Sequence, residues 1–247
     1  MEEKSKIIDK IIRAEWQMFI SVNQGTEADP IKNEHPTCRD FPDEFRTHRE
    51  SKLFAWSCHT LKSYLNDIET AREKGENLMT YKYARMDKLI PCENQIPFID
   101  AIASTLLKWQ KEFIDRYPGI MSGARALSGG QPGIDWPSFE NYLRCELESY
   151  SERTLESLSN DVNALKEKGK NMSDEIYTYL VKKKDISPWK RLRQKRAGYA
   201  ENLHFFLSVS EAVKALFSWL LLINSSYYFS CSINISGQIS AYRRLPP

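Results

Sequence analysis

The sequence predicts an all-α protein, built as a tandem repeat of two three-helix units that form a helical bundle with pseudo-twofold symmetry. Apolar residues recur three and four positions apart along most of the chain, which is the spacing of one face of a helix. The chain also repeats itself: Asp67 returns as Asp161 and Gly75 as Gly169, at the same offset of 94 residues. An ungapped repeat of this kind is typical of a duplicated structural unit.

The first helix of each unit is expected over about residues 3–22 and 97–117. Both segments carry an apolar stripe at helical spacing, with charged residues on the other face. Pro97 suits a first helical turn, and Pro118 followed by Gly119 ends the helix.

A long helix follows in each unit, over about residues 43–74 and 138–168. Each would be roughly 45 Å long at 1.5 Å per residue. Gly75 and Gly169 stand where a helix end favours a left-handed residue, and each follows a lysine that suits the negative end of the helix dipole.

A shorter helix is expected to close each unit, over about residues 79–89 and 173–184, and residues 90–96 join the two units. Turn-forming residues fill the irregular segments 23–42 and 119–137, which follow the two first helices.

Residues 1–197 are predicted to form a single all-α domain, with repeat units at about 1–90 and 91–185. Residues 198–247 share nothing with the repeats and are apolar at first, then rich in Ser and Tyr. They are expected to be a poorly ordered extension or the product of a faulty gene model.

Bulk composition favours a cytoplasmic protein. The five cysteines are odd in number and widely scattered, and the N-terminal residues lack the apolar stretch of a secretory signal. The apolar segment 203–223 is interrupted by His204, Glu211 and Lys214, so a transmembrane span is not expected. A net charge of +2 gives no pull toward nucleic acid, and no specific nucleic-acid partner is predicted.

Two motif-like segments do not predict a site. Residues 127–131 spell the signature loop of ABC-type ATPases, but the chain has no phosphate-binding GxxxxGK[ST] loop to face it. His35 and Cys38 have no second pair of ligands at zinc-site spacing, so no metal site is predicted.

The best candidate site lies on the two long helices, where charges of opposite sign occupy equivalent repeat positions. The three pairs are Arg46 with Glu140, Glu50 with Arg144, and Lys52 with Glu146. Such a network could hold a carboxylate or phosphate through arginine, or supply an acid or base with a shifted pKa. The structural alternatives are a salt-bridge set that fixes the register of the helices, or a solvated face.

A second candidate lies on the short helix after Gly75. Lys82 and Arg85 are three residues apart and therefore share a face, beside Tyr83. A solvated basic edge next to a buried tyrosine is the alternative interpretation.

The same residues carry a resemblance to a known family. Residues 15–19 read Glu-Trp-x-Met-Phe, residues 82–86 read Lys-Tyr-Ala-Arg-Met, and residues 142–144 read Tyr-Leu-Arg. On these motifs the chain resembles, over about residues 5–185, a bacterial and fungal family catalogued as domain of unknown function 4125. The resemblance implies an α-helical domain, sometimes fused or adjacent to a nucleotidyltransferase-like domain, and names no reaction.

The chain departs from the family pattern at three positions. Tyr81, Glu76 and Lys52 stand where the family motif has glutamate, arginine and glutamine. If these side chains belong to one site, the resemblance implies a specialised or weakened version of it.

The leading hypothesis is a central small-molecule site in a biosynthetic enzyme of the secondary-metabolism type, with no cofactor specified. Glu140 or Glu146 would act as acid or base, and Tyr83 or Tyr142 as hydroxyl donor. An anionic or zwitterionic ligand would be bound by basic side chains, namely Arg46, Arg49, Lys52, Lys82, Arg85 and Arg144. The alternative is a non-catalytic helical module that binds a nucleotidyltransferase-like or other enzyme partner.

Overall fold

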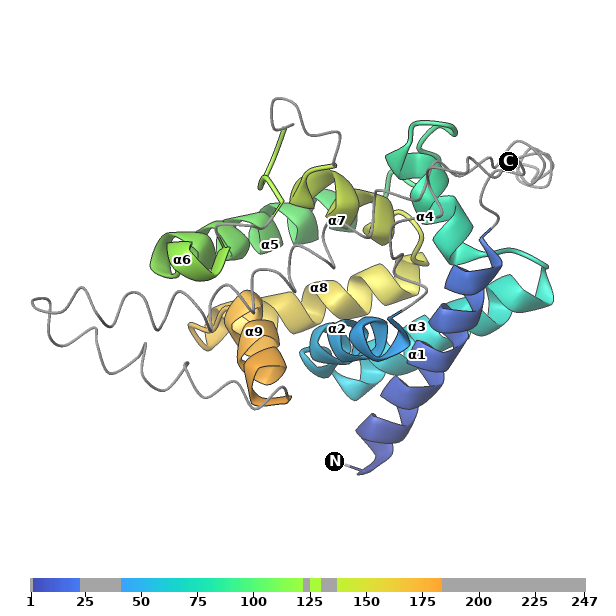
Figure 1. The fold of residues 1–247 in the computed structure, drawn as a ribbon. Coiled ribbons are helices and arrows are strands. Elements are labelled where there is room, and N and C mark those ends of the chain that lie inside the picture. Colours follow the sequence, from blue (N-terminus) through green and yellow to red (C-terminus); the bar gives the residue numbers. More distant parts are fainter. Residues whose placement is uncertain (1, 23–40, 122–124, 130–136, 184–247) are drawn as a thin grey trace, which may run out of the picture.

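A computed structural model of the chain describes residues 2–22, 41–121, 125–129 and 137–183, and these residues form helices and connecting turns without a β-strand (Figure 1). The helices are α1 (Glu2–Ser21), α2 (Pro42–Phe54), α3 (Cys58–Glu73), α4 (Leu78–Met86), α5 (Pro97–Arg116), α6 (Pro118–Met121), α7 (Phe139–Leu147), α8 (Glu152–Glu167) and α9 (Met172–Lys183). The all-α prediction is confirmed. The predicted tail, residues 198–247, lies outside the described residues, as do His35 and Cys38.

Each predicted long helix is in fact two helices, so the prediction of three helices per unit was wrong. The first breaks between α2 and α3, and the second between α7 and α8. At the breaks, the hydroxyls of Ser57 and Ser151 accept hydrogen bonds from the amides of Thr60 (3.2 Å) and Thr154 (3.3 Å). A serine in this position satisfies the free amides of a new helix, so it starts α3 and α8 instead of continuing the helix before it.

The turns into the short helices follow the prediction closely. Gly75 and Gly169 have φ values of 73° and 62°, the left-handed conformation that favours glycine. The side chain of Asn77 then caps α4. At α9, the Asn171 side chain accepts from the amide of Ser173 (2.8 Å), so Asn171 caps the start of this helix.

The helices pack in a pattern that interleaves the two halves of the chain. α1 contacts α2, α3 and α4, and α5 contacts α7, α8 and α9. Contacts across the halves join α3 to α8, α2 to α9 and α4 to α7 (Figure 1). The polar residues of α2 and α7, far apart in sequence, are thereby brought to the centre of the molecule.

An aromatic cluster forms the middle of the core. Trp56 and Tyr150 meet edge to face with ring centroids 5.9 Å apart, and Tyr64 packs against Tyr150 at 4.7 Å. Such pairs contribute about 0.5–1.5 kcal/mol beyond the burial of their area. The described helices include none that is long and apolar enough to cross a membrane.

Candidate functional site

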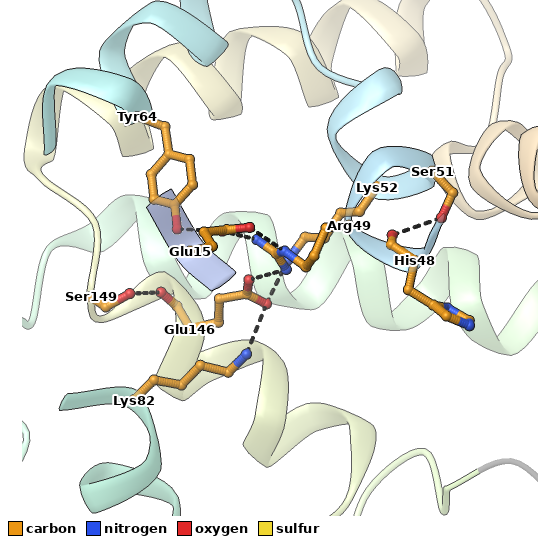
Figure 2. A network of polar contacts seen from close by, with 9 residues as sticks. All are labelled: Glu15, His48, Arg49, Ser51, Lys52, Tyr64, Lys82, Glu146 and Ser149. Carbon is orange, nitrogen blue, oxygen red and sulfur yellow. Dashed lines mark hydrogen bonds and ion pairs between the residues drawn. The ribbon is translucent and has the colours of Figure 1, made fainter. Parts of the chain in front are cut away.

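Four helices contribute side chains to a buried network of charges at the centre of the molecule (Figure 2). Glu15 comes from α1, Arg49 and Lys52 from α2, Lys82 from α4 and Glu146 from α7. All except Lys52 are less than a tenth exposed. Five ionisable groups in one dry region are costly to bury unless they pair, so their geometry decides what they can do.

Arg49 lies between the two carboxylates. Its Nε donates to Oε2 of Glu15 (2.7 Å), its Nη2 donates to the other oxygen of Glu15, and its Nη1 donates to Oε1 of Glu146 (2.8 Å). The hydroxyl of Tyr64 also donates to Glu15 (2.7 Å). The planar guanidinium makes a bidentate contact with Glu15 and still reaches Glu146, which lysine could not do.

Glu146 is surrounded by three cations. Besides Arg49, the Nζ of Lys52 donates to its Oε2 (2.5 Å), and the Nζ of Lys82 lies 3.7 Å from the same oxygen. Burial raises the pKa of Glu146, but Lys52, Lys82 and Arg49 outweigh it and hold the pKa well below the ordinary value. Glu146 is therefore ionised at neutral pH, so it orients cations and does not act as a proton donor.

Lys82 is the least satisfied member of the network. Its side chain is 3% exposed, and its Nζ stands 3.6 Å from the ring centroid of Tyr142. Burial lowers the pKa of Lys82 to about 8, against the opposing effect of Glu146 and with the help of Arg49. The 3.7 Å separation from Glu146 is too long for a hydrogen bond.

A cavity of about 250 Å³ adjoins this network. Arg49, Lys52 and Glu146 line it, together with Tyr142. Much of the remaining wall is apolar and comes from α5, α7, α8 and α9, for example Leu106, Leu143, Leu158 and Leu180. A mostly apolar cavity with a few convergent polar groups is the usual form of a small-molecule site.

A second polar group lines the same cavity on the side of α5 and α9. The hydroxyl of Ser173 donates to the side-chain oxygen of Gln110 (2.9 Å), and the side-chain nitrogen of Gln110 donates to the hydroxyl of Tyr177 (3.2 Å). Tyr177 therefore keeps its own hydroxyl proton available as a donor.

Five of the ten predicted site residues come together here. Arg49, Lys52, Lys82 and Glu146 form the network, and Tyr142 lies between Lys82 and the cavity.

The other five are placed elsewhere. Arg46 pairs with Asp9, Arg85 with Glu148 (2.6 Å), and Arg144 with both Asp100 (2.6 Å) and Glu140 (3.1 Å). Tyr83 is buried, with its ring 6.3 Å from that of Phe19. The structure does not bring Arg46, Tyr83, Arg85, Glu140 or Arg144 to the cavity wall.

Sequence reasoning missed one member of the network, Glu15, and also Tyr64, whose hydroxyl donates to Glu15. A signal for Glu15 was present: it lies three residues after Ile12 and four before Phe19, on the apolar face of the first helix. A carboxylate on a buried face requires a cationic partner, because an unpaired buried charge is very costly. Tyr64 gave no such signal, since a tyrosine on an apolar stripe is common.

Within the described ranges, no three His, Cys, Asp or Glu side chains are arranged to hold a metal ion. No curated protein and no solved structure matches the chain significantly. A family model described as "Protein of unknown function (DUF4125)" matches residues 5–192, which includes every residue of the network and of the cavity wall. With three quarters of its length matched by one model, this chain belongs to the DUF4125 family.

Proposed function

We propose that the protein binds a small organic anion, a monocarboxylate with an apolar body, in the cavity between α2, α5, α7, α8 and α9. The observation that carries this proposal is the charge balance of the buried network. Three cations, Arg49, Lys52 and Lys82, face two carboxylates, Glu15 and Glu146. Among these five side chains of the buried network one positive charge is left over, and the carboxylate of a ligand would neutralise it, since an unbalanced buried charge is costly.

The cavity supports the size and character of such a ligand. Its volume of about 250 Å³ is slightly below the roughly 300–1,000 Å³ of pockets for drug-sized molecules, so it suits a small metabolite. The leucine-rich wall favours a hydrocarbon or aromatic body. The Tyr177 hydroxyl can donate to one further polar group on the ligand.

A pseudo-twofold axis through the network is part of this proposal. Lys52 and Glu146 stand 94 residues apart and touch each other, and so do Trp56 and Tyr150. Equivalent residues can meet in this way only where a symmetry axis passes. The contacts of the helix starts are also reciprocal, because Asp161 accepts from the amide of Ser57 (2.8 Å) as Asp67 accepts from the amide of Ser151 (3.1 Å).

Divergence between the repeats explains why the site lies on one side of such an axis. The repeat counterpart of Arg49 is Leu143, and that of Tyr64 is Leu158. Trp16, which packs against Phe19 and Phe45, corresponds to the smaller Gln110 of the cavity wall. The first half therefore supplies charges and bulky rings, and the second half supplies the apolar wall.

The alternative of a non-catalytic interaction module would need a large exposed apolar patch. Among the described residues, the large apolar side chains that are more than a third exposed are Ile20, Phe54 and Leu89, which belong to three different segments. Nothing in their placement favours that alternative over the cavity.

The test is a binding measurement on the full chain with 4-methylpentanoate and its neutral amide, by thermal shift and calorimetry. The acid should raise the melting temperature and the amide should not, because only the acid supplies the missing negative charge. Lys52→Met should weaken the binding of the acid by about tenfold or more, a loss of about 1.4 kcal/mol.

Lys111→Met is the matched control, since Lys111 pairs with Asp115 on the surface with its side chain 62% exposed. It should leave binding unchanged. Equal binding of acid and amide, or equal loss in the two lysine variants, would contradict the proposal.

A further inference from the structure

The amine of Lys82 stands apart from the other cations of the network. Arg49 and Lys52 make direct hydrogen bonds to carboxylates, whereas the Nζ of Lys82 has none within the part of the chain that the structure describes. Its contacts are the Glu146 oxygen at 3.7 Å, the face of the Tyr142 ring with the centroid at 3.6 Å, and the more distant Tyr83 ring with the centroid at 5.9 Å. The ammonium group is therefore stabilised by the charge of Glu146 and by a cation–π contact, and not by a direct hydrogen bond to a carboxylate.

The same amine lies directly behind the cavity wall. Tyr142 and Glu146 both line the cavity, and Lys82 touches both of them without lining it itself. Figure 2 shows Lys82 extending toward Glu146, which separates it from Arg49. Tyr142 is partly buried and its ring covers the Nζ of Lys82, so a molecule in the cavity reaches this amine only when the Tyr142 ring moves.

Burial also makes this amine more reactive than an ordinary lysine. With a pKa of about 8, about one Lys82 in ten is the neutral amine at pH 7. The fraction for an ordinary lysine is on the order of one in several thousand. Desolvation and a neighbouring cation are the two means by which proteins activate lysine toward carbonyl groups, and here burial and Arg49 provide both.

We propose that Lys82 is a nucleophile that forms an imine with the carbonyl carbon of a 2-oxo acid bound in the cavity. This inference rests on the proposed function and deepens it, because the bound anion becomes a carboxylate with an adjacent ketone. The Lys52 ammonium and the Arg49 guanidinium receive the carboxylate, and the apolar wall receives the side chain of the acid.

The reaction balances without a further reactant. The neutral amine of Lys82 adds to the carbonyl carbon, forming a C–N bond, and the carbonyl π electrons move to oxygen. The oxygen takes up the two protons released by nitrogen and leaves as water, which gives a neutral imine. The imine nitrogen then takes back the proton that the Lys82 ammonium released when it became the neutral amine. The net change is an ammonium and a ketone giving an iminium and water, so the positive charge remains beside the Glu146 carboxylate throughout.

The experiment is reductive trapping on the full chain. The protein is incubated with 4-methyl-2-oxopentanoate and sodium cyanoborohydride near pH 7, and then digested and mapped by mass spectrometry. The peptide with Lys82 should gain the mass of the oxo acid less one oxygen atom. The modification at Lys82 should exceed that at the exposed Lys111 by at least tenfold, since the neutral fraction of the Lys82 amine at pH 7 is roughly several hundred times that of an ordinary lysine.

Two further samples sharpen the result. Lys82→Arg keeps the charge but cannot form the imine, so it should lose the adduct, whereas Lys111→Arg should keep it. The matched acid without a ketone, 4-methylpentanoate, should protect Lys82 by competition. Because the main result comes from peptide mapping of the unaltered protein, it does not depend on whether Lys82→Arg folds.

The two proposals fail in different ways. If the oxo acid raises the melting temperature but leaves Lys82 unmodified, the imine proposal is overturned and anion binding stands. If the oxo acid neither stabilises the protein nor modifies Lys82, both are overturned. Equal modification of Lys82 and Lys111 would mean non-specific chemistry and would also overturn the imine.

Discussion

At the scale of single residues, the central question is which charges the network needs for stability. Glu146 accepts from Arg49 and Lys52 and lies near Lys82, so Lys52 and Lys82 depend on this one carboxylate, whereas Arg49 also pairs with Glu15. Lys52, in contrast, is one of three cations where two carboxylates are available. Removing the Glu146 carboxylate should therefore lower the free energy of unfolding much more than removing the Lys52 ammonium, although the two groups form one ion pair.

We expect Glu146→Gln to lower the free energy of unfolding by about 3–5 kcal/mol, because it leaves buried cations without a partner. Lys52→Met should cost markedly less, because it removes the surplus charge. Urea unfolding of both variants at pH 7 measures the difference. A larger loss for Lys52→Met than for Glu146→Gln would mean that the network has no surplus cation to remove.

His48, on the cavity wall, should make stability depend on pH. Burial lowers the pKa of His48 to about 4, so the unfolded state binds more protons than the folded state between about pH 6.5 and 4. Stability therefore falls as the pH is lowered through that window.

We expect His48→Gln to flatten the fall in unfolding free energy between pH 6.5 and 5, which is above the range where carboxylates titrate. Urea midpoints at closely spaced pH values provide the measurement. A slope that is the same in the variant and in the unaltered protein would show that His48 is protonated at the same pH folded and unfolded.

At the scale of elements, the breaks at Ser57 and Ser151 decide where the polar residues lie. The helical spacing of apolar residues continues from α2 into α3 and from α7 into α8. Periodicity alone therefore predicted one long helix at each place. The Ser-x-x-Thr pattern at each break was visible in the sequence, and its capping role was not recognised. Contacts from the opposite half, at Asp161 and Asp67, then stabilise the new helix starts.

Ser57→Ala and Ser151→Ala should each lower the free energy of unfolding by about 1 kcal/mol, the usual cost of losing a helix cap. Asp161→Asn should weaken the same helix start, because the Asp161 carboxylate accepts from both the amide of Ser57 (2.8 Å) and the hydroxyl of Thr60 (2.7 Å). Thermal unfolding of the three variants gives the values. A rise in stability for Ser57→Ala would mean that α2 and α3 prefer to join as one helix.

At the scale of the whole molecule, the interleaved packing makes the two halves one structure. α2 lies against α9, and α4 lies against α7, so each half completes the packing of the other. The cavity forms where helices of the two halves pack together. A charged wall comes from α2, and much of the rest comes from α5, α7, α8 and α9.

The sequence by itself determined the helical class, the left-handed turns at Gly75 and Gly169, and the membership of Lys52 and Glu146 in one polar centre. These follow from local periodicity, from backbone sterics and from the repeat. Only the tertiary structure decided that Arg49 joins Glu15 and Glu146, which are 34 and 97 residues away along the chain. Helical spacing fixes the face on which a side chain lies, whereas the packing of distant helices fixes which faces meet, and so which charges are buried together.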